Sequence, residues 1–400
     1  MRVAHIITRM IIGGAQENTL FNVDDQQHLF GDEVCLLTGP TTGPEGSLVR
    51  RAQDRGLDLR VVPQLIRSVN PLQDWKALRA LRRSLASFRP DLVHTHSSKA
   101  GILGRLAAHQ LRIPAVHTIH GASFHFGQNR LLHAAYRWSE RKAARWCDQF
   151  ITVCNAMADQ YVAASIAPRE KFTTIYSGMD VDSFLNPARS ATQVRKDLSL
   201  VQSDIVFCKV ARLFHLKGHN HLIEAAPAVV KEVPHVKFLL VGDGVLRRRY
   251  EGRIAELGLT GHFRFAGLVP PETVTDYLHA ADAVVHTSDW EGLARVLPQG
   301  LLAGKPLVSF PIDGAPEVCL HEETGLLVSH GDTGQLSSAM IRLARDEALR
   351  RRLGESGRRR FTDQFRHENM TAKIRGVYRE VLDRRTHRVH IPAAGVQRSR

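Results

Sequence analysis

The sequence predicts an α/β protein built from two doubly wound parallel sheets. Short apolar segments alternate with helical patterns along most of the chain, which is typical of a parallel sheet with helices on both faces. The alternation begins at residues 3–7, gives way to a polar stretch at 186–203, and begins again at 205–211. Glycines and polar side chains gather where the expected strands end, and open parallel sheets bind ligands there. We therefore expect two Rossmann-like domains with ligand-binding loops.

The composition is that of an ordinary soluble enzyme. Of the 400 residues, 43% are hydrophobic and 24% are charged, and no run of eighteen apolar residues predicts a transmembrane helix. The first apolar run contains Arg9 and ends at a glycine pair, unlike a signal peptide. Five cysteines without CxxC spacing indicate neither a disulfide framework nor a zinc site. We expect a cytoplasmic protein.

The net charge of +14 is concentrated in residues 73–146 and 347–400. Nucleic acid and an anionic membrane are two partners that such charge would attract. The chain has no recognisable nucleic-acid-binding module, and its aromatic content of 6% offers few side chains for base stacking. We expect no nucleic-acid partner, although a basic nucleic-acid-binding protein stays an alternative to an enzyme.

The first half of the chain should form one sheet. Its strands are expected at 3–7, 33–37, 59–62, 92–96, 115–119, 150–153 and 173–176. Gly14 belongs to a glycine pair between the first strand and its helix, which allows a phosphate or a sugar to approach the backbone. His96 and His120 stand where two separate strands end. These positions make them candidates for a site, although a single histidine near a strand is usually structural.

The second half should form another sheet. Its strands are expected at 205–211, 236–241, 262–266, 283–287, 307–310 and 326–328. Arg212 and Lys217 share one loop, and a planar fork beside a point charge suits a diphosphate. Glu291 follows the strand at 283–287, and a helix should begin near Arg295, with Pro298 in its first turn. The helix N-terminus favours an anion or an acceptor-rich ligand.

These motifs resemble glycosyltransferase family 4, the retaining nucleotide-sugar transferases of the GT-B fold. The resemblance spans roughly residues 3 to 382 and depends on the segments 94–101, 117–121, 177–184, 210–218 and 286–318. It implies that Arg212 and Lys217 bind the donor pyrophosphate, that Glu291 holds the donor sugar, and that His120 hydrogen-bonds a sugar hydroxyl. The further donor contacts that it implies are Gly14, Gly242, Val269, Gly292, Leu293 and Gln299. Gln299 departs from the family, which usually has a glutamate there for the ribose hydroxyls.

The resemblance also implies a domain plan. Residues 1–187 should form the acceptor-side domain, 188–362 the nucleotide-sugar-binding domain, and 363–383 a crossover helix that packs back on the first domain. The basic tail, 384–400, should be disordered.

The expected reaction moves a sugar from a UDP- or GDP-sugar to a glycan, lipid-linked or small-molecule acceptor, in cell-surface polysaccharide or glycolipid synthesis. No side chain stands out as a covalent nucleophile, so we expect front-side attack with retention, without a cofactor or a metal. A nucleotide-sugar epimerase of the same fold is an alternative, and would release product without an acceptor.

Residues 129–146 predict a basic amphipathic helix. On a helical projection, Arg130, Arg137, Arg141 and Arg145 form one stripe. The apolar residues opposite are Leu132, Ala135, Tyr136, Ala143 and Trp146. We expect this helix to dock on an anionic membrane, which would place the enzyme peripherally on the inner face of the plasma membrane.

Overall fold

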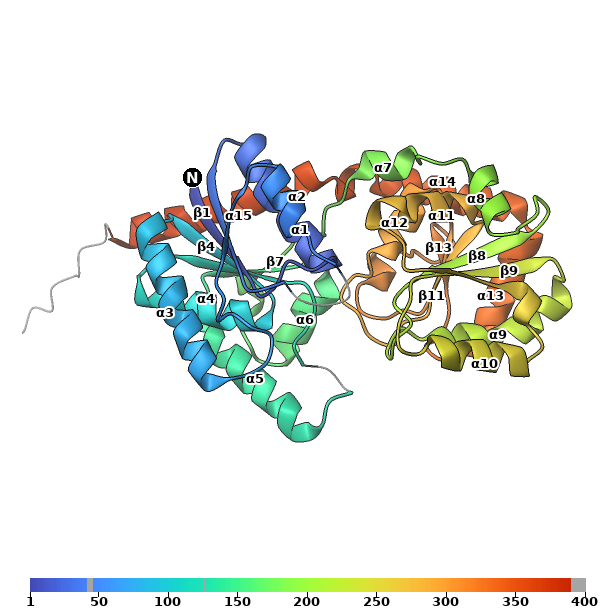
Figure 1. Ribbon diagram of the computed structural model, residues 1–400, viewed down its shortest axis with the longest axis horizontal. Helices are drawn as coiled ribbons and strands as arrows, with labels where there is room; N and C mark the ends of the chain where they lie inside the picture. The colour runs from blue at the N-terminus through green and yellow to red at the C-terminus, as the bar shows by residue number, and fades with distance from the viewer. Residues whose placement is uncertain (42–45, 125–126, 390–400) are drawn as a thin grey trace, which may run out of the picture. The chain divides into compact units, whose positions relative to one another are not determined.

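The computed structural model describes residues 1–41, 46–124 and 127–389, and the chain forms two compact units. The first unit contains Met1–Val153, Ala158–Ile175 and Glu368–Arg400. The second contains Cys154–Met157 and Tyr176–His367. Each unit is a parallel sheet covered by helices, as Figure 1 shows. The predicted fold class, two Rossmann-like parallel-sheet domains, is therefore confirmed.

The first unit has a sheet in the order β3-β2-β1-β4-β5-β6-β7, and all of its strand pairs are parallel. The strands are β1 (Arg2–Ile7), β2 (Glu33–Thr38), β3 (Asp58–Val61), β4 (Leu92–His96), β5 (Ala115–Ile119), β6 (Gln149–Thr152) and β7 (Phe172–Thr174). The helices between them are α1 (Gly14–His28), α2 (Val49–Asp54), α3 (Pro71–Phe88), α4 (Ser98–Gln110), α5 (Arg130–Ala144) and α6 (Asn155–Ala163). The strand order reverses between β1 and β4, which is where sheets of this kind bind ligands.

The second unit repeats this plan in the order β10-β9-β8-β11-β12-β13. Its strands are β8 (Ile205–Val210), β9 (Val236–Val241), β10 (Phe263–Gly267), β11 (Ala283–His286), β12 (Leu307–Ser309) and β13 (Gly325–Leu327). Its helices are α7 (Val181–Leu185), α8 (Ala191–Asp197), α9 (His219–Glu232), α10 (Arg247–Glu256), α11 (Val274–Ala280), α12 (Val296–Leu302), α13 (Thr333–Arg345) and α14 (Glu347–Phe361). Its strand order reverses between β8 and β11.

The local sequence explains where these elements begin and end. In α3, the side chain of Asn70 accepts the N–H of Gln73 at 3.1 Å, and Pro71 occupies the first turn, where its missing N–H costs nothing. The same helix ends at Arg89, which adopts a left-handed conformation. Strands β4, β5 and β11 are buried along their whole length, as expected for strands covered on both faces.

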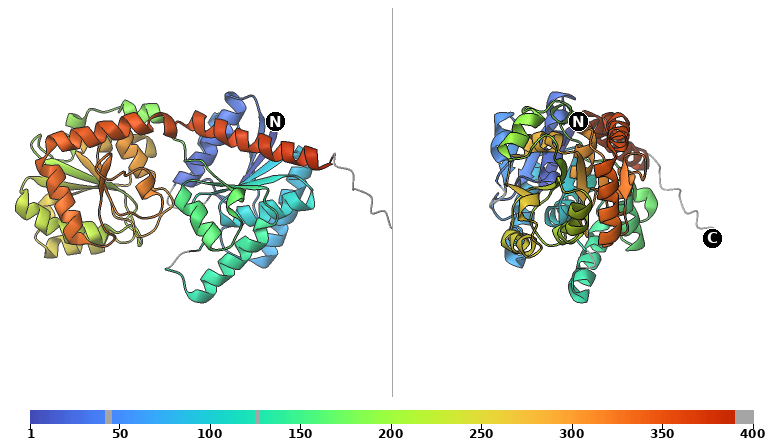
Figure 2. Two further views of the ribbon diagram at one scale, coloured as in Figure 1. Left: turned by 180° about the vertical axis from the view of Figure 1, so that it is seen from behind. Right: turned by 90° about the vertical axis from the view of Figure 1, so that its right-hand side faces the viewer.

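The C-terminal helix α15 (His367–Val389) packs on the sheet of the first unit, as predicted for the crossover helix (Figure 2). Its apolar face, Met370, Ile374, Val377, Tyr378 and Val381, contacts buried residues of β1, β4, β5 and β6. Arg375 adds a two-pronged ion pair with the buried Asp32, at 2.7 and 3.0 Å. Apolar burial together with a paired charge fixes this helix to a sheet that is distant in sequence.

Three boundaries differ from those expected. The N-terminal part of the first unit ends at Ile175, earlier than residue 187, because Met179 and Phe184 are buried in the core of the second unit. The second unit continues to His367, beyond residue 362, and α15 begins at that residue. Helix α15 continues to Val389, so residues 384–389 are helical and not part of a disordered tail. Arg385 pairs with Asp148 at 2.9 Å and helps to hold this last turn. The rest of the expected tail, 390–400, lies outside the described residues.

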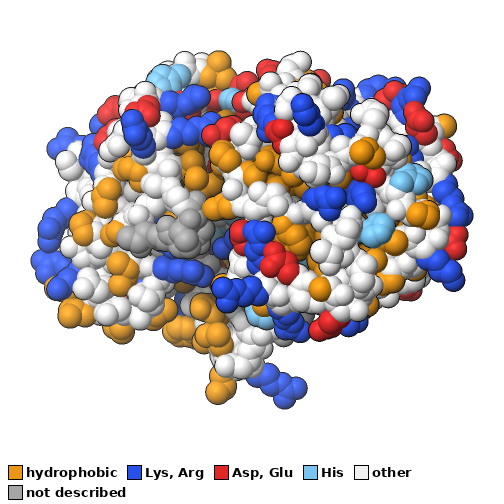
Figure 3. Space-filling view, turned by 45° about the vertical axis from the view of Figure 1, so that its right-hand side comes forward, with side chains coloured by type: hydrophobic (Ala, Val, Ile, Leu, Met, Phe, Trp, Pro, Cys, Tyr) orange, Lys and Arg blue, Asp and Glu red, His pale blue; other side chains and the backbone are white. Residues whose placement is uncertain are grey.

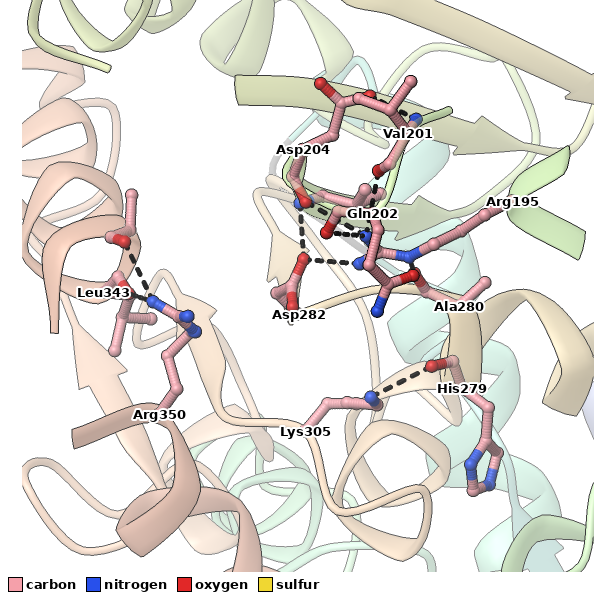
Figure 4. A network of polar contacts seen from close by, with 12 residues as sticks. Arg195, Val201, Gln202, Asp204, His279, Ala280, Asp282, Lys305, Leu343 and Arg350 are labelled. Carbon is pink, nitrogen blue, oxygen red and sulfur yellow. Dashed lines mark hydrogen bonds and ion pairs between the residues drawn. The ribbon is translucent and has the colours of Figure 1, made fainter. Parts of the chain in front are cut away.

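At the amino ends of β8 and β11, a polar network holds the second sheet together (Figure 4). The guanidinium of Arg195 donates to the Ala280 carbonyl at 2.9 Å and to Asp282 Oδ2 at 2.8 Å. Asp282 Oδ2 also accepts the N–H of Val206 at 2.7 Å. Lys305 donates to the His279 carbonyl at 3.0 Å, and burial lowers its pKa to about 8. The Arg195–Asp282 ion pair and the Lys305 hydrogen bond lie at the edge away from the loops that follow the strands, which indicates a structural role.

Among the described residues, no helix combines the length and the apolar character needed to cross a membrane.

Candidate functional site

The loops that carry the predicted donor contacts lie at one edge of the second sheet. Arg212 and Lys217 follow β8, Gly242 follows β9, Val269 follows β10, and Glu291 follows β11. Because these strands are parallel, their carboxyl ends meet at the same edge. The structure therefore brings together residues that are spread over some eighty positions of the sequence.

Lys217 and Glu291 form an ion pair at this edge. The Lys217 ammonium donates to Glu291 Oε1, and the Ser288 hydroxyl donates to the same oxygen at 3.1 Å. The N–H of Glu291 donates to Asp313 Oδ2 at 2.8 Å, which ties down the loop backbone. Both side chains of the ion pair remain partly exposed, at 24% and 19%. A cation and a carboxylate are thus held in fixed positions while solvent, or a ligand, can still reach them.

Two glycines allow these loops to approach one another closely. Gly218 has a φ of +60°, and a Cβ there would lie 1.6 Å from the Thr287 carbonyl oxygen. The Thr287 hydroxyl donates to the Gly218 carbonyl at 2.6 Å, so the loop after β8 is bound to the end of β11. Gly242 has a φ of +129°, and a Cβ there would lie 2.3 Å from the Ala211 carbonyl oxygen. No other residue fits these positions without moving the loops.

Lys209 lies directly behind this edge and was missed by the sequence analysis. It is 1% exposed, and its ammonium donates to the Thr287 hydroxyl at 2.9 Å. Burial is the main cause that lowers its pKa to about 7, and Lys217 lowers it further, while Glu291 and Asp289 oppose the shift. A lysine inside the apolar strand Ile205–Val210 was the available signal. This edge of the second sheet therefore contains a buried lysine whose pKa burial lowers to about 7.

Two buried imidazoles lie close to Lys209. Burial, followed by the charges of Lys209 and Lys217, lowers the pKa of His219 and of His286 well below the usual value. His286 Nδ1 hydrogen-bonds the Ser309 hydroxyl at 3.0 Å. Among the described side chains, both ring nitrogens of His219 and Nε2 of His286 are buried without a hydrogen-bond partner. Neutral rings add no further positive charge around Lys209.

The other predicted donor contacts fall around the same loops. The carbonyl of Gly292 accepts the N–H of Gly314 at 2.9 Å, which joins the Glu291 loop to the segment after β12. Leu293 and Val269 are half-buried against the second core. Gln299 lies on α12, half-buried beside the buried Leu297 and Leu301.

In the first unit, a row of histidines runs inward from His120. His120 follows β5, and its Nε2 lies 3.1 Å from His96 Nδ1. His96 Nε2 lies 3.1 Å from His5 Nδ1, and His5 Nε2 lies 3.3 Å from Gln26 Oε1. His94 is bound at Nδ1 to the Tyr378 hydroxyl of α15 at 2.5 Å. We call His5, His94, His96 and His120 the histidine row.

Burial makes the inner members of the histidine row neutral. It lowers the pKa of His5 to about 4 and that of His94 and His96 well below the usual value. A neutral imidazole has one donor and one acceptor nitrogen, so the hydrogen bonds that join His5, His96 and His120 fix their tautomers in turn. Gln26 donates through Nε2 to Asn22, which leaves its oxygen to accept from His5 Nε2. His96 then donates to His5, and His120 donates to His96.

This order of donors also fixes the tautomer of a neutral His120 ring. Its Nε2 carries the proton that is given to His96, so Nδ1 is the acceptor nitrogen. An acceptor nitrogen suits the hydroxyl group of a sugar. His96 itself is 1% exposed and lies behind His120, to which it is hydrogen-bonded. Gly14 begins α1 at the same edge of this sheet and is half-buried.

Comparison with known proteins identifies the family. The family described as "Glycosyl transferases group 1" matches residues 190–360, and "Glycosyl transferase 4-like domain" matches residues 24–178. An Escherichia coli UDP-Gal:alpha-D-GlcNAc-diphosphoundecaprenol alpha-1,3-galactosyltransferase is 26% identical over 96% of this chain and 97% of its own length. A lipopolysaccharide core biosynthesis glycosyltransferase of Rhizobium meliloti is 35% identical over 49% of this chain and 55% of its own length.

Solved structures show the same fold. HepE of Anabaena, crystallised in complex with UDP, superposes with a TM-score of 0.81 at 20% identity, covering 95% of this chain and all of that one. The lipopolysaccharide glycosyltransferase WaaG superposes with a TM-score of 0.70 at 17% identity, covering 93% of this chain and 98% of that one. With both family matches, the relatives and the loop geometry in agreement, the chain belongs to the group 1, family 4-like glycosyltransferases of the GT-B fold.

Proposed function

We propose that this glycosyltransferase moves a hexose from a UDP-sugar to a lipid-linked glycan, with retention at the anomeric carbon. The observation that carries the proposal is the Lys217–Glu291 pair at the carboxyl ends of β8 and β11, with Arg212 in the same loop as Lys217. The two cations can bind the phosphate oxygens of a nucleotide sugar, and the carboxylate can accept hydrogen bonds from the hydroxyl groups of its sugar. The names of the Escherichia coli relative and of the HepE complex favour UDP over GDP.

In this mechanism the protein stabilises charge and holds the sugar. The bond between the anomeric carbon and the β-phosphate oxygen breaks, and Arg212 and Lys217 neutralise the developing negative charge on the diphosphate. The acceptor hydroxyl attacks the face that the diphosphate leaves, and its proton passes to the departing phosphate oxygen. Glu291 and His120 Nδ1 accept hydrogen bonds from sugar hydroxyls, which orients the donor. No covalent intermediate with the protein is needed.

The test is transfer to a polyprenyl-diphosphate-linked N-acetylglucosamine. UDP-glucose, UDP-galactose, UDP-N-acetylglucosamine and GDP-mannose are compared as donors, and the anomeric configuration of the product is read by proton NMR. We expect product from a UDP-sugar with the donor's anomeric configuration. An inverted product would overturn the front-side mechanism. A changed sugar formed without any acceptor would identify an epimerase instead.

A lipid-linked acceptor requires the enzyme to reach a membrane surface. The sequence predicts that the arginine stripe of α5 does so, but the structure favours another part of this helix. The guanidinium groups of Arg137 and Arg141 both donate to the Ala164 carbonyl, at 2.7 to 3.1 Å, beyond the end of α6. The expected basic stripe is therefore partly used in packing within the unit. The apolar residues left in solvent are Leu131, Leu132 and Trp138, which are 85%, 43% and 63% exposed.

We propose that this apolar end of α5, flanked by Arg130 and Lys142, docks on an anionic membrane. In Figure 3, hydrophobic side chains gather on the projection at the bottom of the view, where α5 lies in Figure 1. The ammonium of Lys142 lies 5.5 Å from the Trp138 ring centroid, so the aromatic and basic groups are adjacent. Such a pairing suits the boundary between lipid headgroups and acyl chains.

Sedimentation with phosphatidylglycerol vesicles tests the docking. We expect Leu131→Ser combined with Trp138→Ser to reduce vesicle binding strongly, while an Arg137→Gln control disturbs only the packing on α6. Equal vesicle binding by wild type and the Leu131/Trp138 variant would exclude α5 as the docking surface, without affecting the assignment of the donor site.

A further inference from the structure

The second unit contains a cluster of metal-type ligands beyond the residues assigned to the donor. His221 lies in the first turn of α9, Asp289 follows β11, and His330 lies between β13 and α13. Their ligand atoms all lie within 4.8 Å of one another. The fold therefore gathers two imidazoles and a carboxylate from three segments that are far apart in the sequence.

The geometry of the cluster is close to that of a bound ion. His221 Nε2 lies 2.9 Å, and His330 Nε2 3.0 Å, from the same oxygen, Asp289 Oδ1. In a tetrahedral zinc site with bonds of about 2.0–2.2 Å, neighbouring ligand atoms are roughly 3.3 Å apart. Each nitrogen–oxygen distance needs to open by only a few tenths of an ångström to admit the ion. Two imidazoles and one carboxylate are also a ligand set that zinc takes in proteins, with water in the fourth position.

The surroundings hold the rings in place and leave an entry path. Phe310 is fully buried, and its ring packs edge to face with both His221 and His330 at centroid distances of 5.3 Å. The side chain of His330 is 45% exposed, whereas those of His221 and Asp289 are 19% and 23% exposed. A metal site that exchanges its ion needs ligands held in place by their surroundings and one side open to solvent. The cluster has both features, because Phe310 packs against the rings and His330 is partly exposed.

Another trio, His5, His94 and His96 of the histidine row, also places ring nitrogens within 4.8 Å of one another. Its nitrogens are already engaged, because His5 bonds Gln26 and His96, while His94 bonds Tyr378 and Thr118. All three rings are at most 1% exposed, so an ion would have no path to them. In the cluster of the second unit, His221 and His330 bond Asp289, which is itself one of the three ligands. Its side chains are also partly exposed, so an ion can reach them.

We propose that His221, Asp289 and His330 bind a divalent transition metal ion, with Zn²⁺ the best match to their nitrogen and oxygen ligands. The ion would join the loop after β11 to α9 and to the segment before α13. Asp289 stands two residues before Glu291 in that loop, so occupancy would restrict the loop that carries a donor contact. The metal takes no part in bond breaking, and the site is independent of the function proposed above.

Metal titration of the full-length, tag-free protein tests this site. After dialysis against a chelator, Zn²⁺ binding is measured by calorimetry and Co²⁺ binding by visible absorption. The key variant is Asp289→Asn, because an amide oxygen still accepts hydrogen bonds from the imidazoles but is a poor metal ligand. His330→Gln removes a second ligand. His28→Gln is the control, because the His28 side chain is 52% exposed and hydrogen-bonds the carboxylate of Asp24 at 3.0 Å.

We expect one Zn²⁺ per chain in wild type and in His28→Gln, and affinity lowered at least roughly 10- to 100-fold in Asp289→Asn and His330→Gln. Circular dichroism shows that each variant is folded. Co²⁺ bound by wild type should give the absorption of a four-coordinate site that Asp289→Asn lacks. Wild-type affinity no higher than that of Asp289→Asn would overturn the proposal and leave Asp289 as a hydrogen-bond acceptor alone.

Discussion

The two units share one fold, but the side chains near the carboxyl ends of their strands differ in charge. In the first unit, the groups behind the strand ends are imidazoles that burial keeps neutral and that hydrogen-bond one another. In the second, the equivalent edge holds Lys217 paired with Glu291, and Lys209 buried behind them. A neutral row can orient a sugar hydroxyl, whereas a charged edge can stabilise a diphosphate. The difference shows that strand-end residues divide one architecture into a neutral half and a charged half.

The largest expected effect comes from removing the charges of the second unit. Lys217→Ala and Arg212→Ala should each lower sugar transfer by at least about 100-fold, because losing one donor to a developing anion costs roughly 2.7–4 kcal/mol. Initial rates of transfer measure the effect, and Lys231→Ala, an exposed lysine of α9, serves as the matched control. Retention of more than half the activity by either variant would break the assignment of this edge to the diphosphate.

The next effect concerns the pH dependence of stability, which should change over different pH ranges in the two units. His5 has a folded pKa of about 4, below the value near 6.5 of an unfolded chain, so its contribution to stability is lost as pH falls from 6.5 toward 4. Lys209 has a folded pKa of about 7, below the unfolded value near 10.4, so its burial destabilises the fold most at pH 7 and below. That cost is relieved as pH rises above 7.

Lys209→Met should remove this alkaline response. From pH 7 to 9, the free energy of unfolding of wild type should gain up to about 1.4 kcal/mol for each pH unit relative to the variant. Urea unfolding at pH 7, 8 and 9 measures the difference, and the comparison cancels the titration of the buried thiols, which both proteins share. Parallel profiles for the two proteins would mean that Lys209 remains protonated throughout, and the charged half would then be more strongly cationic than described.

A smaller effect is expected from the neutral half. His96→Leu leaves His120 and His5 without their partner, and we expect transfer to fall about tenfold, equivalent to 1.4 kcal/mol, since an unmade buried hydrogen bond costs about 1–3 kcal/mol. The ¹⁵N chemical shifts of His120 should show loss of the single tautomer. His96→Gln, which can both donate and accept, should restore part of the rate. An unchanged His120 tautomer in His96→Leu would show that the row does not orient it.

The smallest effect concerns the ribose. Gln299→Glu would supply a carboxylate in place of an amide, and a charge-assisted hydrogen bond adds perhaps 1 kcal/mol, or about fivefold tighter UDP binding. Calorimetry with UDP measures this, and activity should be kept. A folded but inactive Gln299→Glu protein would show that α12 does not contact the ribose, and would confine the charged half to the loops after β8 and β11.

Much of this molecule follows from the sequence because its signals are local. Alternation of apolar segments and helical patterns predicts both parallel sheets, and most strands lie within a residue or two of the expected positions. The loop residues Arg212, Lys217 and Glu291 could be placed at one edge of the sheet because they follow strand ends, and parallel strands bring such ends together. This shared edge depends on the strands being parallel, which the alternation of strands and helices along the sequence predicts.

Tertiary structure alone decided the features that depend on contacts between distant segments. The chain passes from the first unit to the second between Ile175 and Tyr176, because the burial of Met179 and Phe184 depends on which core they reach. The burial of Lys209 and its hydrogen bond to Thr287 depend on the packing of β8 against β11. The tautomer of His120 follows from a row that passes through His5, and the cluster of His221, Asp289 and His330 has no recognisable spacing. A sequence records which groups are present, but burial and hydrogen bonding, which set charge and tautomer, arise only when the chain is packed.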